Sequence, residues 1–315
     1  MTTTNCAECG KEDGGVSLKA CKSCMQAKYC DAKCQKNHWP KHKKACKQRA
    51  AELRDEALFQ VPPAKEDCPI CFLPMPVRLL PCISLPPATI LSVPIKDFAD
   101  ENEALAAKAT KQYYPCCGKS ICAGCIYSLC ESGNIWTCPF CNSDRSNKTE
   151  EERVQELMKR VEVNDPGAIK MLAGCYYQGL NGVQRDHAKA NELFTKSAEL
   201  GCSEAHRALG NNEGGDMKKT KFHLEAAAML GHENSRCNLG NIEAQSGNME
   251  RAVKHWTIAA SAGDYIAMHH LRICFEKGSV CRESIDSILT AYNSSCAEMR
   301  SEARDAAIQS EIDTI

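Results

Sequence analysis

The chain has few aromatic side chains and almost no net charge. Aromatic residues make up 6% of its 315 positions, so a core must rely mainly on alanine, leucine and isoleucine. The formal net charge of -1 argues neither for nor against nucleic acid as a partner. With 25% charged residues, the remaining composition is that of an ordinary globular protein.

The sequence also lacks a recognisable signal peptide and any long apolar run. Its first residues, Met1 to Cys6, are polar. The most apolar stretch, residues 79–95, is interrupted by prolines and is too short to cross a bilayer. We therefore expect an intracellular protein, cytoplasmic or nuclear, with no membrane partner.

Cysteine, by contrast, is abundant, with 23 residues, most of them in the first half of the chain. In a reducing compartment, closely spaced cysteines are expected to bind metal rather than to form disulfides. The spacing Cys-x2-Cys allows one tight turn to aim two sulfurs at the same ion. It occurs at Cys6/Cys9, Cys21/Cys24, Cys68/Cys71, Cys122/Cys125 and Cys138/Cys141.

Residues 1–49 form the first cysteine-rich block. Its candidate ligands are Cys6, Cys9, Cys21, Cys24, Cys30, Cys34, His42 and Cys46. Eight ligands satisfy two tetrahedral zinc sites. Together with Tyr29, Gln35 and Trp39, their order resembles the MYND zinc finger. The resemblance implies two interleaved sites, with His38 outside both: Cys6, Cys9, Cys30 and Cys34 in one, and Cys21, Cys24, His42 and Cys46 in the other.

The resemblance implies that this finger binds short proline-containing peptides of partner proteins. Because the protein supplies all eight ligands, both sites are closed and structural. The alternative is a redox-active or free thiol cluster. Lysines are frequent in the block, but thiolates offset much of their charge, so a solvated face is expected and nucleic acid is an unlikely partner. A lysine methyltransferase, as some MYND proteins are, is disfavoured because the sequence shows no methyl-donor motif.

Residues 50–67 are predicted to be a linker that is helical up to Gln60 and is ended by the prolines that follow. A second cysteine-rich block covers residues 68–141 and contains an insertion over residues 83–115. Within the insertion, residues 98–112 have the composition of a solvated helix. Residues 142–150 are predicted to form a polar hinge.

The second block resembles a RING finger of the all-cysteine kind, both in its pair spacing and in the residues Ile70, Trp136 and Pro139. The resemblance implies two sites: Cys68, Cys71, Cys122 and Cys125 in one, and Cys116, Cys117, Cys138 and Cys141 in the other. The usual third and fourth ligands are separated by one residue, so Cys82 remains an alternative to Cys116. Cys130 is expected to be a small buried residue rather than a ligand.

RING fingers recruit ubiquitin-conjugating enzymes, and Ile70, Trp136 and Pro139 match the apolar platform that does so. The alternative for Trp136 is a place in the core of the zinc domain. Many active members carry Arg or Lys directly after the last cysteine, whereas this chain has Asn142. The resemblance therefore leaves ligase activity open, and it assigns no catalytic residue.

Residues 151–282 repeat a two-helix pattern every 30 to 37 residues. Each copy begins with a small residue and places leucine four residues later: Ala168 and Leu172, Ala205 and Leu209, Ser235 and Leu239, Ala267 and Leu271. Gly201, Gly231 and Gly263 end the second helices. The pattern resembles the Sel-like repeat, a relative of the tetratricopeptide repeat. The resemblance implies a helical stack with a concave surface for a partner, and residues 283–315 are expected to cap it.

The sequence thus predicts a multi-domain protein with two small cross-braced zinc modules, four structural zinc ions and an all-α helical-repeat solenoid. The leading function is a zinc-binding scaffold or adaptor for protein–protein interaction. One alternative is a RING-type ubiquitin ligase whose repeats select substrates. Another is a transcriptional regulator that acts through the MYND finger. If the solenoid is only a spacer for the zinc fingers, partners bind the fingers alone.

Overall fold

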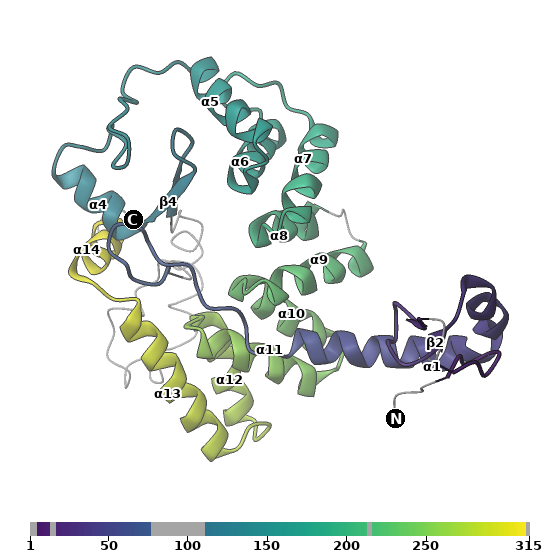
Figure 1. The fold of residues 1–315 in the computed structure, drawn as a ribbon. Coiled ribbons are helices and arrows are strands. Elements are labelled where there is room, and N and C mark those ends of the chain that lie inside the picture. The colour runs from purple at the N-terminus through teal and green to yellow at the C-terminus, as the bar shows by residue number, and fades with distance from the viewer. Residues whose placement is uncertain (1–4, 13–16, 77–110, 213–215, 313–315) are drawn as a thin grey trace. The chain divides into compact units, whose positions relative to one another are not determined.

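A computed structural model describes residues 5–12, 17–76, 111–212 and 216–312 (Figure 1). The chain divides into two compact units, Met1–Gln60 and Val61–Ile315, and each is described by itself. Cys82 and the greater part of the predicted insertion lie outside the described residues.

The first unit is a small finger built on one long helix. Strand β1 (Lys19–Ala20) pairs with β2 (Lys28–Tyr29) in antiparallel fashion, and α1 (Ala32–Leu58) follows. Asp31 caps α1, because its carboxylate accepts a hydrogen bond of 2.7 Å from the backbone N–H of Cys34. The cap fixes the start of the helix next to the cysteine-rich turns.

The helix predicted over residues 50–60 is not a separate linker element. It is the second half of α1, which passes through Pro40 and ends at Leu58. The difference arises because the ligands of the finger already lie on the first turns of this helix, and nothing in the sequence from Lys47 onward breaks it before the prolines.

After the turn that carries Cys68 and Cys71, the second unit has a small sheet and a short helix. Strand β3 (Lys111–Tyr114) pairs with β4 (Lys119–Cys122), and α4 (Ala123–Glu131) follows. Tyr114 and Ile121 are fully buried in this hairpin. Because Lys111 and Gln112 lie in β3, the prediction of a helix up to residue 112 is wrong at its end.

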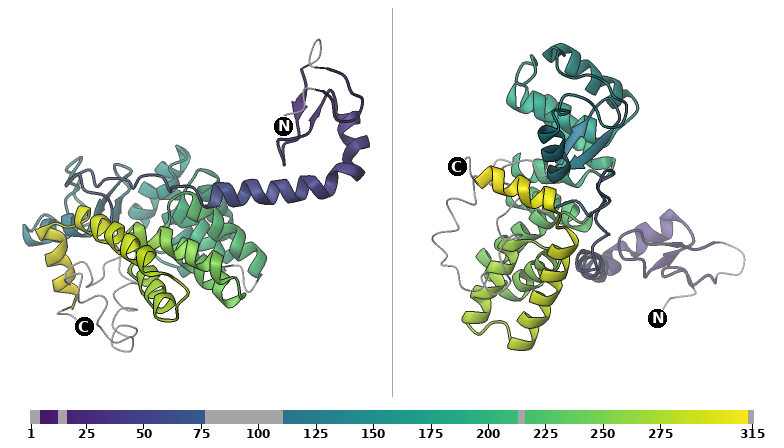
Figure 2. Two further views of the ribbon diagram at one scale, coloured as in Figure 1. Left: turned by 90° about the horizontal axis from the view of Figure 1, so that it is seen from below. Right: turned by 90° about the vertical axis from the view of Figure 1, so that its left-hand side faces the viewer.

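The repeat region consists of α5 (Glu150–Glu162) followed by antiparallel helix pairs, which are seen from two further sides in Figure 2. The pairs are α6 (Pro166–Gln178) with α7 (His187–Glu199), α8 (Ser203–Asn212) with α9 (Met217–Met229), α10 (Glu233–Gln245) with α11 (Met249–Ser261), and α12 (Tyr265–Glu276) with α13 (Arg282–Glu298). This confirms the predicted helical solenoid.

Local capping explains where these helices begin and end. Aspartate side chains accept backbone N–H groups at the starts of α6, α7, α9 and α12. The glycines predicted to end second helices, Gly201, Gly231 and Gly263, have φ values of 88°, 86° and 92°. Only glycine adopts this left-handed geometry without strain, so each pair ends in the same tight turn.

The core of the solenoid follows the repeat. The small residue that opens each copy is fully buried, at Ala168, Ala205, Ser235 and Ala267. The leucine four residues later is at most 5% exposed in every copy, at Leu172, Leu209, Leu239 and Leu271. Small side chains permit close approach between helices, while the leucines fill the space between them.

The predicted C-terminal cap is in fact two helices. Helix α13 packs on α11 and α12 and covers the end of the repeats. Helix α14 (Glu302–Ile312) packs instead on α4, in the second cysteine-rich region. Among the described residues, no helix has the length and apolar character needed to cross a membrane.

Candidate metal centres

Four of the Cys-x2-Cys pairs lie in the same kind of turn. In each, the backbone N–H after the second cysteine donates to the carbonyl of the first, over 2.8 to 2.9 Å. The donating residue has a left-handed backbone with φ between 55° and 72°, and these residues are Gly10, Met25, Phe72 and Asn142. This turn directs both sulfurs of a pair to the same side, as a shared ion requires.

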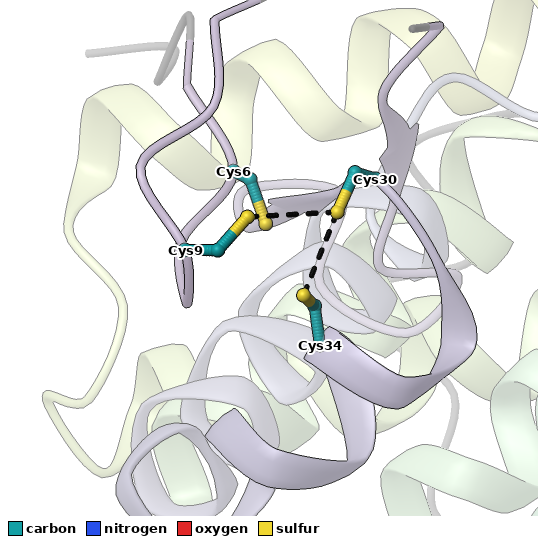
Figure 3. Close-up of side chains that lie close together, drawn as sticks. All are labelled: Cys6, Cys9, Cys30 and Cys34. Atoms are coloured by element: carbon teal, nitrogen blue, oxygen red, sulfur yellow. Dashed lines mark hydrogen bonds between the residues drawn. The ribbon is translucent and has the colours of Figure 1, made fainter.

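The first group joins Cys6 and Cys9 with Cys30 and Cys34, whose side chains point toward one another in Figure 3. The Sγ atoms of Cys9 and Cys30 lie 3.6 Å apart, and those of Cys30 and Cys34 lie 3.5 Å apart. Cys30 follows β2 and Cys34 lies in the first turn of α1, so the strand and the helix fix their positions.

The second group joins Cys21, Cys24, His42 and Cys46, all of them buried. Cys21 and Cys46 have sulfurs 3.6 Å apart, and His42 Nε2 lies 3.3 Å from Cys24 Sγ. His38 is outside the group: its ring stacks on His42, and its Nδ1 lies 3.0 Å from the hydroxyl of Tyr29. The two groups are thus interleaved along the chain.

The second unit contains two more groups. The third group consists of Cys68, Cys71, Cys122 and Cys125, and the fourth group consists of Cys116, Cys117, Cys138 and Cys141. Sulfur separations of 3.7 to 3.8 Å join members of the first of these groups, and 3.7 Å separates Cys117 from Cys138 in the other. Adjacent cysteines reach one group because a turn at Gly118, with φ of 66°, follows them.

These separations fit zinc and not disulfides. Four ligands about 2.3 Å from a central zinc ion, in a tetrahedron, place their sulfurs roughly 3.8 Å apart. A disulfide would bring two sulfurs to about 2.05 Å. The ligand atoms within each group all lie within 4.8 Å of one another. The described part of the chain therefore carries four sites of the structural zinc type, each with four protein ligands and no open position.

The pKa values of the thiols differ within each group. One thiol in each group has a lowered pKa: Cys6, Cys21, Cys68 and Cys141. Hydrogen bonding from the backbone of Cys9 is the main reason why the pKa of Cys6 falls to about 6. Burial and neighbouring thiols raise the pKa of Cys46 to about 12. Four crowded sulfurs ionise together only when a cation balances their charge.

The residues of the predicted apolar platform lie at the surface of the second unit. Ile70 is 37% exposed and Trp136 is 55% exposed, so Trp136 is not a core residue. Pro139 is half-buried in the last Cys-x2-Cys turn. Cys130, expected to be buried, is exposed near the end of α4 and belongs to none of the four groups.

A cleft of about 1620 Å³ lies between the repeats and segments that precede them in the second unit. Residues 63–67, strand β3 and the starts of α6, α8 and α10 line it. Lys65 donates to the carbonyl of Ala262 over 2.5 Å, and Lys111 lies 2.7 Å from Glu204. Part of the surface predicted to receive a partner is therefore covered from within the same unit, which the repeat pattern did not reveal.

Comparison with known families agrees with this arrangement. The model of the MYND finger family matches residues 6–46, the span that holds the first two groups. The chain carries a MYND finger. The Sel1 repeat model matches residues 166–202 and 224–264, which include α6, α7, α10 and α11. The second half of the chain therefore contains Sel1 repeats.

Similarity to individual proteins is local. Histone-lysine N-methyltransferase SMYD3 of Homo sapiens is 56% identical over 34 residues. The match covers 11% of this chain and 8% of that enzyme, so the methyltransferase activity does not carry over.

Two solved structures show a distant similarity to this chain. The Sel1 repeat protein from Oxalobacter formigenes is 21% identical, with 57% of this chain and 73% of that chain covered and a TM-score of 0.41. A protective antigen of uropathogenic Escherichia coli that displays an SLR fold is 19% identical, with coverages of 61% and 44% and a TM-score of 0.38.

Proposed function

We propose that the chain is a scaffold that recognises other proteins through separate surfaces on a metal-stabilised frame. The main support is that each metal group has four protein ligands. A site without an open position cannot activate water or substrate, so the metal contributes folding free energy rather than chemistry. We assign the sixteen Cys and His residues of the four groups as the zinc ligands.

The MYND finger is the proposed site for proline-containing peptides. Trp39 lies on α1 and is 40% exposed, and its ring lies 6.3 Å from that of His42. Aromatic surfaces of this kind accept the polyproline II conformation, which a proline-rich peptide adopts with little loss of entropy. The zinc group beneath it would fix the orientation of the indole.

We expect Trp39→Ala to weaken binding of a proline-rich peptide to the full chain at least ten-fold, because an aromatic anchor carries much of such an interface. Isothermal titration calorimetry measures the affinity, and metal analysis checks that zinc is retained. Met25→Ala is the matched control, since Met25 is 62% exposed on the same finger. Equal affinity in the wild type and in Trp39→Ala would remove the finger's proposed role.

A second candidate function is that of a RING-type ubiquitin ligase. It is favoured by the exposure of Ile70 and Trp136, because a core role would have buried both side chains. Such an enzyme holds a ubiquitin-conjugating enzyme on the apolar platform without forming a covalent bond to its own cysteines. The repeats would then select the substrate.

A further inference from the structure

A buried arginine connects the C-terminal helix to the third metal group. Arg304, on α14, is 2% exposed. Its Nη1 donates to the carbonyls of Pro74 and Met299 over 2.8 and 2.7 Å. Its Nη2 donates to the carbonyl of Leu73 over 3.3 Å and to Cys71 Sγ over 3.4 Å. The guanidinium therefore contacts a proposed zinc ligand and also fixes the turn that carries it.

Close helix packing supports this contact. Helix α14 lies beside α4 (Figure 1), and the backbone of α14 closely approaches Gly124 of α4. A Cβ atom at this position would lie 2.6 Å from Cγ of Arg304 and 2.8 Å from its backbone nitrogen. Since real Cβ atoms do not approach backbone this closely, only glycine admits α14 at this distance.

A second arginine, half-buried at the start of the helical region, contacts the module through backbone carbonyls only. Arg160, on α5, donates from Nε to the carbonyl of Pro115 over 3.0 Å and from Nη2 to that of Cys116 over 3.4 Å. Next to it, the hydroxyl of Tyr113 donates to Asp165 over 2.8 Å. These contacts fix the turn that carries two cysteines of the fourth group.

Charge explains why arginine is used at both places. Four thiolates and one Zn²⁺ leave an all-cysteine site with two negative charges. Guanidinium groups remain protonated, and their N–H groups stabilise sulfur and carbonyl acceptors. Residues behind the metal ligands, which orient and neutralise them, typically change metal affinity 10- to 100-fold.

We propose that Arg304 and Arg160 are positioning residues for zinc, by which the helices that flank the repeats, α14 and α5, determine how firmly the third and fourth groups keep their metal. The cysteine-rich module of the second unit is then completed by two helices that both follow it in the sequence, α5 directly and α14 at the far end of the repeats. This rests on the zinc-ligand roles proposed above.

Site-resolved alkylation of zinc-loaded full chain tests the proposal. Under a limiting chelator, iodoacetamide labels cysteines as they lose zinc, and mass spectrometry identifies each one. We expect Arg304→Met to speed labelling of Cys68, Cys71, Cys122 and Cys125 at least ten-fold. Arg160→Met should do the same for Cys116, Cys117, Cys138 and Cys141. The MYND cysteines should label at the wild-type rate in both.

Arg282→Met is the control, because its side chain is 74% exposed on α13. Gly124→Ala should reproduce the faster labelling seen in Arg304→Met, since it displaces α14 while leaving the arginine present.

Wild-type labelling in both arginine variants would overturn the proposal. If Arg304→Met unfolds the second unit, Arg304→Lys decides: faster labelling confined to the third group supports the role, and uniform labelling overturns it. Fewer than four zinc ions in the unsubstituted chain would instead refute the ligand assignment.

Discussion

Asn142 occupies the left-handed position that follows the last metal-binding turn, with φ of 56°. Asparagine tolerates this backbone better than most residues with a side chain. An arginine there would lose about 1 kcal/mol to strain. The local backbone therefore favours asparagine at this position, where many active RING fingers carry a basic residue.

Substitution at two positions tests the ligase candidate. We expect Ile70→Ala to reduce ubiquitin chain formation roughly 30-fold, as removal of an interface anchor costs about 2 kcal/mol. Asn142→Arg should raise activity despite its strain, because it restores the missing cation. An autoubiquitination assay with a panel of conjugating enzymes measures both. Leu180→Ala, at a residue 49% exposed between α6 and α7, is the control. Unchanged chain formation in Ile70→Ala would contradict the platform.

The metal ligands could be predicted from the sequence because their spacing is local. A Cys-x2-Cys turn brings its two sulfurs together whatever the rest of the chain does. Arg304 could not be found in this way, since 233 residues separate it from Cys71. An arginine in a short helix without a clear apolar face gives no local sign that its guanidinium is buried.

The helix pairs of the solenoid were predictable for a different reason. Small residues, leucines and closing glycines recur with the repeat, and each has a defined place in the packing between helices. Strand β3, at the end of the predicted insertion, was missed because it is defined by its pairing with β4 rather than by its own composition. Helix α14 was assigned to the repeats because a helical pattern does not reveal which surface it covers.

Burial within the pairs predicts the cost of a single truncation. Leu239 is fully buried in α10, so Leu239→Ala should lower the free energy of unfolding by about 2–5 kcal/mol. Leu230→Ala should cost less than about 1 kcal/mol, because Leu230 is 42% exposed. Denaturant unfolding of the two variants measures the difference. Equal losses would show that Leu239 does not belong to a packed core.

The division into two units determines how the chain responds to loss of metal. Zinc in the first unit stabilises the finger alone, whereas the second unit combines two metal groups with the solenoid. The sequence predicted separate modules and could not indicate this partition, because contacts such as those of Arg160 and Arg304 join segments distant along the chain. The helices that flank the repeats, α5 and α14, therefore form part of the frame of one zinc module, so this half of the chain is more than a spacer between zinc fingers.

Removal of zinc by a chelator should separate the stability that the metal supplies from the stability of the solenoid itself. We expect four zinc ions per chain and, after their removal, a helical signal that persists but melts roughly 6–12 °C lower. This corresponds to a loss of about 3 kcal/mol from a few hydrogen bonds. Circular dichroism and metal analysis provide the measurements.

Single substitutions give the matched comparison. Cys71→Ser should lower the melting temperature of the helical signal, whereas Cys9→Ser, in the first unit, should leave it unchanged. A melting curve that is insensitive to chelator would mean that the second module and the solenoid are energetically independent.

The contact between Arg304 and Cys71 also affects the order of events during synthesis. A ribosome adds about 5–20 residues per second. Arg304, which lies 233 positions after Cys71, therefore appears roughly 10 to 50 s after it. During that interval the thiols of the third group are exposed to oxidants and competing metals, and the guanidinium that donates to Cys71 is not yet present. A nascent chain released before residue 304 would keep every cysteine of this group and still lack its last supporting side chain.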